Sequence, residues 1–315
     1  MNEKTLAAVA LSNRDFPSFE AKLAEAVRWI ELAANQGADL VVLPETINYF
    51  RGDGPDNGNR LTAEEAALDD WKSVTRPLFD VARSCAVALT IPVLTREGDH
   101  YVNSFFLVSK TGAVIGQYQK IRVTPGELKD GVKPGRFSLM EWEGLKVGGG
   151  ICFDCYFPEV FHQQAEAGAD LFLVPSLTPG GDHLNFYALN YSTPIVLAYP
   201  AWSRIIDVDG RELAAGGYRS ETLRFGFGAP VIMATINFDR VVLHIDFNQS
   251  RMVDIQRTYG ERVRVTLNQH NSIFILESRS PDLTVREIME RFDLVSKRVY
   301  LRPFSNPAQD LRRDA

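Results

Sequence analysis

The chain alternates between short continuous apolar runs and stretches in which apolar residues return with helical spacing. Residues 5–12 read "TLAAVALS", a run that predicts a buried strand. The next stretch, 18–36, predicts a helix with one apolar face. Ser18 can cap the start of that helix, and Gly37 can end it. Its apolar face contains Leu23, Val27, Ile30 and Ala34.

The same alternation continues along most of the chain. Further helices are predicted over 63–84, from about Pro158, and over 182–191. The turn "SKTG" joins two strands into a hairpin, so the sheets should be mixed rather than purely parallel. Strands that alternate with helices indicate a layered α/β domain. The predicted strands are 38–45, 86–94, 101–109, 113–121, 145–153, 169–176, 203–208, 231–237 and 240–246.

The pattern changes after about residue 247. Residues 261–278 predict a hairpin around "NQHN", and Pro281 fits the first turn of a helix that runs through Phe292. This part contains too little apolar material for a good core of its own. We therefore expect one domain over residues 1–246 and an extension over 247–315.

Composition and charge exclude several classes of function. The chain has 315 residues, of which 45% are hydrophobic and 23% charged, as in ordinary globular proteins. Its net charge of −6 provides no basic field for nucleic acid or an anionic membrane. No apolar run reaches the roughly 18–20 residues of a membrane span, and the N-terminus is a poor signal peptide. Three cysteines make no disulfide framework, so a reducing, cytoplasmic location is expected.

Two of those cysteines stand three residues apart, in "GGGICFDCYFPE". The spacing of Cys152 and Cys155 fits a redox pair, half of a metal site, or one reactive thiol beside a bystander. A zinc site would need further ligands, and Cys85 is isolated. A thioredoxin-like pair normally opens a helix, whereas "YFPE" follows Cys155. The glycines 148–150 are not part of a phosphate loop, and we interpret them as allowing close backbone approach near the reacting group.

Three predicted strands each end near one ionisable side chain: Glu45, Lys120 and Cys152. Taken singly, each has an ordinary structural explanation. Catalytic groups in α/β sheets gather at the carboxyl ends of strands. A thiol, a carboxylate to take its proton and an ammonium to stabilise an oxyanion would make a complete acyl-transfer set. Spacing along the chain does not show that the three meet in space.

Five segments, in order, resemble the nitrilase or carbon–nitrogen hydrolase superfamily, and the likeness covers roughly residues 4–246. It rests on "VVLPE", "YVNSFFLVSKTG", "YQKIRVTPGE", "VGGGICFDCYFPE" and "AGADLFLVPS". The resemblance implies an α-β-β-α sandwich with mixed sheets, whose subunits pair as αββα–αββα in an oligomer that is at least a dimer. It also implies that the extension 247–315 serves oligomerisation or covers the pocket.

The resemblance assigns roles to individual residues. Glu45 matches the general base, Lys120 the oxyanion stabiliser and Cys152 the nucleophile. Glu127 matches a second glutamate that orients the lysine or the substrate. The backbone N–H of Phe153 is expected in the oxyanion hole. Two further positions, Asn103 and Asp154, match family residues with a structural role.

The implied activity is hydrolysis of a non-peptide C–N bond, in an amide or carbamoyl amine, through a cysteine thioester. It releases ammonia or an amine together with an acid, and it requires no metal and no organic cofactor. A nitrilase acting on a C≡N bond is the close alternative, and an acyl-transfer or amidotransferase-like role is a weaker one. An alternative of another class is a family member that only binds a ligand or partner. The altered region 177–207 keeps that alternative open.

The chain departs from the family's pattern around the expected pocket. Tyr156 occupies a position where many family amidases have arginine. Together with Tyr49 it predicts an aromatic wall for a neutral, apolar or cationic small molecule. The equally simple alternative is that Tyr156 only packs. Among the histidines, His183 is placed to contact substrate rather than to act as a base.

Overall fold

The computed structural model describes residues 2–11, 16–48, 62–217 and 230–301. Contacts divide the chain into two compact units. One comprises Thr5–Ala234, and the other comprises Met1–Lys4 with Thr235–Ala315. The second unit thus begins earlier along the chain than the expected extension.

The first sheet has the strand order β12-β1-β2-β3-β4-β5. Strands β1, β2 and β3 pair in parallel, whereas β4 pairs antiparallel with both β3 and β5. The hairpin predicted around "SKTG" is therefore confirmed. The bounds are β1 Glu3–Val9, β2 Leu40–Val42, β3 Ala88–Glu97, β4 His100–Val108, β5 Val114–Gln119 and β12 Val231–Asn237.

The second sheet has the order β11-β10-β9-β8-β7-β6. Its three central strands, β7 to β9, pair in parallel, and β6, β10 and β11 add antiparallel edges. Both sheets are mixed, as predicted, although β6, β9 and β11 were not anticipated. The bounds are β6 Met140–Trp142, β7 Leu145–Gly149, β8 Leu171–Pro175, β9 Ile195–Ala198, β10 Ser203–Ile206 and β11 Glu212–Gly216.

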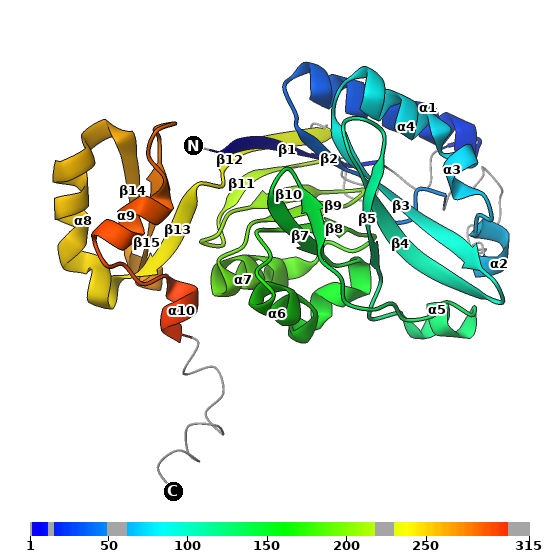
Figure 1. The fold of residues 1–315 in the computed structure, drawn as a ribbon. Helices are drawn as coiled ribbons and strands as arrows, with labels where there is room; N and C mark the ends of the chain where they lie inside the picture. Colours follow the sequence, from blue (N-terminus) through cyan, green and yellow to red (C-terminus); the bar gives the residue numbers. More distant parts are fainter. Residues whose placement is uncertain (1, 12–15, 49–61, 218–229, 302–315) are drawn as a thin grey trace, which may run out of the picture. The chain divides into compact units, whose positions relative to one another are not determined.

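Helices cover the outer faces of the two sheets, which gives the predicted α-β-β-α sandwich (Figure 1). Helices α1 (Phe19–Asn35) and α4 (Arg76–Ser84) bury their apolar faces against the first sheet. Helices α6 (Pro158–Glu166) and α7 (Gly181–Tyr191) do the same against the second sheet. The N-cap predicted for α1 is present, because Oγ of Ser18 accepts a hydrogen bond from the N–H of Ala21.

The single helix expected over 63–84 is instead three short helices: α2 (Ala63–Ala66), α3 (Trp71–Val74) and α4. Thr62 and Asp70 each cap a new helix start, and Pro77 lies in the first turn of α4. A proline in that position cannot continue a preceding helix. Local capping therefore overrode the continuous apolar period.

The second unit contains the antiparallel sheet β13-β15-β14, with strands Arg240–His244, Ile273–Ser278 and Val263–Asn268. The hairpin predicted around "NQHN" is confirmed. Helix α8 (Ile245–Tyr259) was not predicted, and α10 (Lys297–Leu301) follows α9. Helix α9 (Val285–Arg291) starts after its cap Thr284 rather than at Pro281. This unit has an apolar core of its own, contrary to our expectation, built around Leu243, Ile255, Phe274, Leu276 and Ile288.

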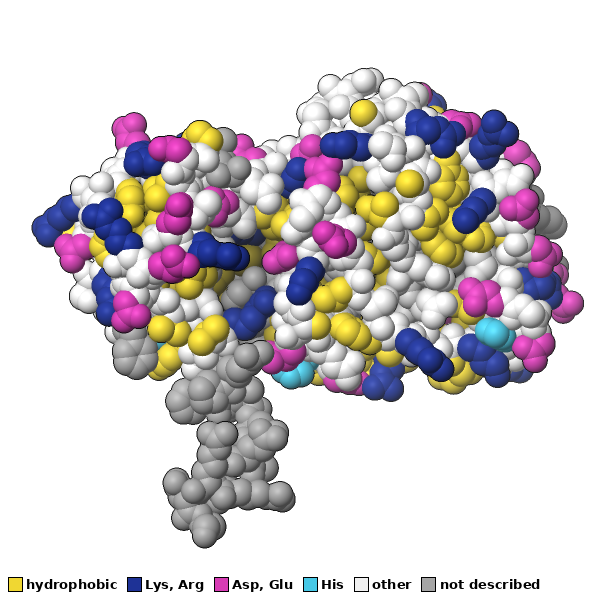
Figure 2. All heavy atoms as spheres, in the orientation of Figure 1, with side chains coloured by type: hydrophobic (Ala, Val, Ile, Leu, Met, Phe, Trp, Pro, Cys, Tyr) yellow, Lys and Arg dark blue, Asp and Glu magenta, His cyan; other side chains and the backbone are white. Residues whose placement is uncertain are grey.

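The visible surface carries no single-sign field. In Figure 2, lysine and arginine side chains are interspersed with aspartate and glutamate side chains over the described residues. None of the helices formed by the described residues is long and apolar enough to cross a membrane.

Candidate active site

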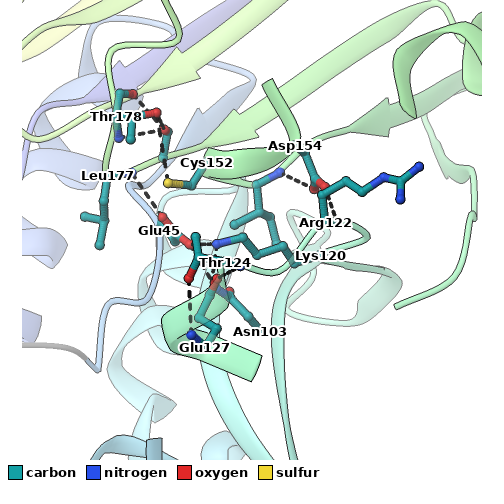
Figure 3. A network of polar contacts seen from close by, with 12 residues as sticks. Glu45, Asn103, Lys120, Arg122, Thr124, Glu127, Cys152, Asp154, Leu177 and Thr178 are labelled. Atoms are coloured by element: carbon teal, nitrogen blue, oxygen red, sulfur yellow. Dashed lines mark hydrogen bonds and ion pairs between the residues drawn. The ribbon is translucent and has the colours of Figure 1, made fainter. Parts of the chain in front are cut away.

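The predicted chemical residues come together where strands of the two sheets end (Figure 3). Glu45 follows β2, Lys120 follows β5 directly, and Cys152 follows β7. Leu177 and Thr178 follow β8 and approach the same place. The structure therefore supplies the convergence that spacing along the chain could not show.

Cys152 does not lie in the strand predicted over 145–153. It is the first residue of a 3₁₀ helix, η1 (Cys152–Tyr156), and its backbone has a φ of +49°. Non-glycine residues rarely adopt this left-handed conformation, because Cβ crowds the neighbouring backbone. Such strain persists only where the surroundings impose it, and it is concentrated at functional sites.

Asp154 holds this strained turn from both sides. Its Oδ2 accepts hydrogen bonds from the N–H of Ile151 at 2.9 Å and from the hydroxyl of Tyr118 at 3.0 Å. Its Oδ1 accepts one from the N–H of Arg122 at 2.7 Å. Burial raises the pKa of Asp154 to about 6, although the donated hydrogen bonds oppose the rise. Asp154 thus ties the cysteine turn to the segment that follows Lys120.

The glycines before the cysteine do permit close approach, but to packing partners rather than to a reacting group. A Cβ on Gly149 would lie 2.2 Å from the carbonyl oxygen of Leu173 on β8. A Cβ on Gly148 would lie 2.3 Å from Oε1 of Gln164, whose amide hydrogen-bonds both N–H and C=O of Gly149. The glycine run therefore serves close packing of the strand that leads to Cys152.

Four buried side chains form a closed hydrogen-bonded group. Nζ of Lys120 lies 2.9 Å from Oε1 of Glu45 and 2.8 Å from Oε1 of Glu127. Nδ2 of Asn103 donates to the same two oxygens, at 2.8 and 2.9 Å. The resemblance implies a structural role for Asn103, and these two hydrogen bonds show how Asn103 holds the carboxylates on either side of Lys120.

Local sequence explains how Glu127 reaches this group. Helix α5 (Pro125–Lys129) starts with a capping box in which Thr124 and Glu127 exchange hydrogen bonds. The N–H of Thr124 donates a hydrogen bond to Oε2 of Glu127, so Oε1 of Glu127 is left to accept hydrogen bonds from Lys120 and Asn103. The segment "TPGE" is a typical helix start, so this feature is readable from sequence.

Burial and neighbouring charges set the protonation of the group. Burial alone would lower the pKa of Lys120, but the adjacent carboxylates of Glu45 and Glu127 raise it above its usual value. Burial would raise the pKa of Glu127, but the Lys120 ammonium and the donated hydrogen bonds lower it. Lys120 is therefore charged and Glu127 ionised at neutral pH.

The thiol behaves in the opposite way. Burial, followed by the negative charge of Glu45, raises the pKa of Cys152 to about 12, and the pull of Lys120 only partly opposes this. The resting thiol is therefore neutral. A neutral thiol is a weak nucleophile unless a base takes its proton, and Glu45 is the carboxylate next to it.

The loop after β8 completes the surroundings of the thiol. The N–H of Leu177 donates to Oε2 of Glu45 at 3.1 Å, and Oγ1 of Thr178 lies 4.0 Å from Sγ of Cys152. Ser176 shapes the loop, since its Oγ bonds both N–H and C=O of Thr178. Sequence reasoning missed these residues, although "LVPS" repeats the strand-then-proline pattern of "VLPE" and so marks an equivalent strand end.

Arg204 on β10 anchors the far end of that loop. Its Nη2 donates to the carbonyl oxygens of Pro179 at 2.9 Å and Gly181 at 2.8 Å. Its Nη1 donates to Oδ1 of Asn185 on α7 and to Glu212. A buried guanidinium thus connects three elements to the segment that faces Cys152, and we did not anticipate this from sequence.

Of the three residues predicted to contact substrate, the structure describes Tyr156 and His183. The rings of Tyr156 and His183 meet edge to face with centroids 5.6 Å apart, and the Phe153 ring lies 5.7 Å from that of Tyr156. Tyr156 and His183 are both exposed. Tyr49 lies outside the described residues. Cys155 is fully buried, and burial raises its pKa well above the usual value, which suits a bystander.

No group of three or more His, Cys, Asp or Glu side chains placed to hold a metal ion occurs within the described ranges.

Comparison with known proteins identifies relatives for most of the chain. The model of the carbon–nitrogen hydrolase family matches residues 5–243. A nitrilase of Pyrococcus abyssi is 33% identical over 159 residues, which are 48% of this chain and 57% of that protein. A citrullinase of Francisella tularensis is 28% identical over 57% of this chain and 64% of its own length. The matches thus span less than two thirds of these two relatives.

Solved structures share the fold at low sequence identity. An amidase from Nesterenkonia sp. AN1, determined in complex with acrylamide, superposes with a TM-score of 0.61 at 20% identity. The match covers 82% of this chain and 97% of that one.

Proposed function

Because the chain belongs to the carbon–nitrogen hydrolase family, we propose that it cleaves a non-peptide C–N bond through a thioester on Cys152. One observation carries this proposal. The Lys120 ammonium forms hydrogen bonds with two buried carboxylates, those of Glu45 and Glu127. Glu45 is also close enough to the thiol of Cys152 to raise its pKa. Nucleophile, base and oxyanion stabiliser are therefore neighbours in a water-poor site.

The first half of the reaction forms the thioester. Glu45 takes the thiol proton as Sγ of Cys152 attacks the carbonyl carbon. Two of the three Nζ protons of Lys120 are engaged by Glu45 and Glu127, and the third stabilises the developing oxyanion. The N–H of Phe153, in the first turn of η1, is a second donor of the kind that a helix leaves without an internal acceptor. The C–N bond then breaks, and Glu45 returns the proton to the leaving nitrogen.

The second half releases the acid. Glu45 takes a proton from water, and the resulting hydroxide adds to the thioester carbonyl. The C–S bond breaks, the proton passes back from Glu45 to sulfur, and the free thiol is restored. Glu127 and Asn103 act by holding Lys120 and Glu45 in place throughout.

An amide or carbamoyl amine is the substrate class that we favour. Relatives named citrullinase and amidase support this choice, whereas the relative named nitrilase supports the alternative of a C≡N substrate. The exposed edge-to-face pair of Tyr156 and His183 offers an aromatic surface for a neutral or cationic group. Three further points remain predictions. Tyr49 contacts the substrate, the protein assembles into a dimer or larger oligomer, and residues 247–315 serve that assembly or cover the pocket.

A substrate panel tests the proposal. The protein is incubated with primary amides, carbamoyl amines and nitriles, ammonia release is measured, and mass spectrometry is used to trap the acyl adduct on Cys152. We expect turnover of an amide or carbamoyl amine, and none by Cys152→Ala. Ammonia from nitriles alone would establish the nitrilase alternative.

The ligand-binding alternative predicts a different result. No turnover on any class, together with a Cys152 that does not react with small alkylating amides, would overturn the enzyme proposal. Glu45→Gln should fold normally and lose hydrolysis. Retention of near wild-type rates by that variant would remove Glu45 from the role of base.

A further inference from the structure

Asn48 follows the candidate base, Glu45, by three residues, and its side chain is buried, with 4% exposed. It forms three hydrogen bonds, all with backbone groups of other segments. Nδ2 donates to the carbonyl oxygens of Ala66 at 2.6 Å and Leu94 at 2.9 Å. Oδ1 accepts a hydrogen bond from the N–H of Leu94 at 3.0 Å. Both amide protons and the amide oxygen of Asn48 therefore attach the Glu45 segment to α2 and β3.

The segment from Leu43 to Asn48 lies along β3 and is attached to it at both ends. At its start, the N–H of Leu43 donates to Oγ1 of Thr90 at 3.0 Å. Near its end, the N–H of Ile47 donates to the carbonyl oxygen of Pro92 at 2.7 Å. Asn48 adds the last attachment, two residues further along β3. The candidate base thus lies between two fixed points.

The backbone is strained between these fixed points. Thr46, directly after Glu45, has a φ of +48°. This left-handed conformation is uncommon for any residue with a Cβ and is an outlier for a β-branched one. Such a conformation persists only where the surrounding structure imposes it. On the C-terminal side of Thr46, Ile47 contributes one hydrogen bond to that hold and Asn48 contributes three.

The position of the Glu45 carboxylate depends on this backbone conformation. Its Oε1 accepts hydrogen bonds from Lys120 at 2.9 Å and Asn103 at 2.8 Å, and its Oε2 accepts one from the N–H of Leu177 at 3.1 Å (Figure 3). These three donors belong to other parts of the fold. Relaxation of Thr46 to a negative φ would shift the residue before it, so the carboxylate would leave its donors.

We propose that Asn48 is a positioning residue for Glu45. Its side chain holds the segment in the backbone conformation that brings the Glu45 carboxylate to both Lys120 and the thiol of Cys152. The inference rests on the function proposed above, in which Glu45 is the base. It deepens that function by naming the side chain that keeps the base in place. Asn48 acts through the backbone and not on the reacting atoms.

A crystal structure of Asn48→Ala tests the geometry directly. We expect Thr46 to relax to a negative φ in this variant. We also expect Oε1 of Glu45 to lie beyond hydrogen-bond distance of Nζ of Lys120. A structure of Asn48→Ala that keeps Thr46 at a positive φ and Glu45 bonded to Lys120 overturns the proposal.

Asn248, in the second unit, is a matched control for Asn48. It is 1% exposed, and its Nδ2 donates to the carbonyl oxygens of His244 and Val295. Its Oδ1 accepts a hydrogen bond from the N–H of Val295. Asn248→Ala therefore removes the same set of hydrogen bonds from a segment that carries none of the proposed catalytic groups.

The kinetics of the two alanine variants separate positioning from general destabilisation. A displacement of about 1 Å near the reacting groups lowers the rate about 10- to 100-fold. We expect kcat of Asn48→Ala to fall by this factor with little change in KM, because Glu45 acts in the chemical step. Asn248→Ala should keep the wild-type kcat. Equal losses of kcat in the two variants would overturn the proposal.

The pH profile of iodoacetamide alkylation reports the position of Glu45 without any turnover. After burial, the negative charge of Glu45 is the main cause of the raised pKa of Cys152. The inflection should therefore move downward in Asn48→Ala, toward that of Glu45→Gln, and should not move in Asn248→Ala. An unmoved inflection in Asn48→Ala counts against the proposal. A downward shift in a protein that hydrolyses nothing keeps the positioning role and removes the reaction.

Should Asn48→Ala fail to fold, Asn48→Asp and the wild type still decide. Aspartate keeps the shape but, when ionised, offers no proton to the carbonyl oxygens of Ala66 and Leu94. It should therefore lower kcat and the alkylation inflection in the same direction, and wild-type values would overturn the proposal. In the wild type, the amide of Leu94 should exchange as slowly as those between β3 and β4. Rapid exchange at Leu94 would show that Asn48 does not hold β3.

Discussion

Nζ of Lys120 lies 2.9 Å from Oε1 of Glu45, and both side chains are almost completely buried. The two residues are 75 positions apart in the chain and lie next to strands of one sheet. Lys120 bonds Glu127 at 2.8 Å as well, so one ammonium compensates two carboxylates. The tertiary fold therefore brings together the ammonium and the two carboxylates that the proposed chemistry requires.

Removing this ammonium should destabilise the protein. Lys120→Met leaves two buried carboxylates without their cation, and breaking a buried pair in this way costs about 3–5 kcal/mol. Urea unfolding measures the free energy of unfolding. Adding Glu45→Gln and Glu127→Gln to Lys120→Met should recover part of the loss, because no uncompensated charge then remains.

A surface lysine is the matched control for Lys120. Lys110 pairs with Glu143 at 2.7 Å but is 57% exposed, so Lys110→Met should change the unfolding free energy little. Comparable losses for Lys110→Met and Lys120→Met would show that burial of the central pair has no special energetic weight.

Glu45 should govern the reactivity of the thiol as well as hydrolysis. Its negative charge is, after burial, the main cause of the raised pKa of Cys152, which is about 12. Glu45→Gln should therefore move the pH inflection of iodoacetamide alkylation downward, while hydrolysis is lost. Glu127→Gln is the control, because Glu127 bonds Lys120 in the same way but does not bond the thiol, and its inflection should move less. If the wild type, Glu45→Gln and Glu127→Gln show the same pH profile of alkylation, the charge of Glu45 does not raise the pKa of Cys152.

Arg204 should affect the rate through the loop that it holds. Arg204→Lys keeps the charge but not the fork that bonds Pro179 and Gly181. Without that fork the loop is held less firmly, so the N–H of Leu177 moves away from Glu45 and Thr178 moves away from Cys152. A displacement of about 1 Å near the reacting groups lowers the rate about 10- to 100-fold. We expect kcat to fall more than KM rises, with faster hydrogen exchange at Leu177.

Another arginine separates positioning from general destabilisation. Arg122 pairs with Glu159 at the surface, where both side chains are 45% exposed, so Arg122→Lys should leave kcat and exchange at Leu177 unchanged. If Arg204→Lys lowers the unfolding free energy but not kcat, Arg204 is structural only.

Asp154 should contribute a distinctive pH dependence of stability. Its pKa rises from the usual 3.8 to about 6 on folding, chiefly through burial. The folded state then binds the proton more tightly, so this contribution to the unfolding free energy falls as pH rises from about 4 to 6. The change corresponds to about 3 kcal/mol. Urea unfolding of the wild type and of Asp154→Asn measures this effect. The unfolding free energy of the wild type, relative to that of Asp154→Asn, should fall as the pH rises from about 4 to 6. A difference between the two proteins that stays constant over this pH range would refute the prediction.

Much of the fold was readable from the apolar pattern because its period reflects local burial. The short apolar runs became strands, and the capped run from Ser18 became α1. The pattern failed where local and long-range preferences compete. Residues 63–84 broke into three helices at new caps, and the second unit formed a core that composition did not suggest.

The sequence by itself determined which chemical groups the chain carries and in what order, because residue types and strand ends are local properties. Predicted strand ends pointed to Glu45, Lys120 and Cys152, and the resemblance to the family added Glu127. Tertiary structure alone decided that Asn103 bridges two carboxylates, that Cys152 takes a left-handed backbone, and that Leu177 reaches Glu45 across 132 positions. Such contacts depend on how two sheets pack, and no period or spacing along the chain encodes that packing.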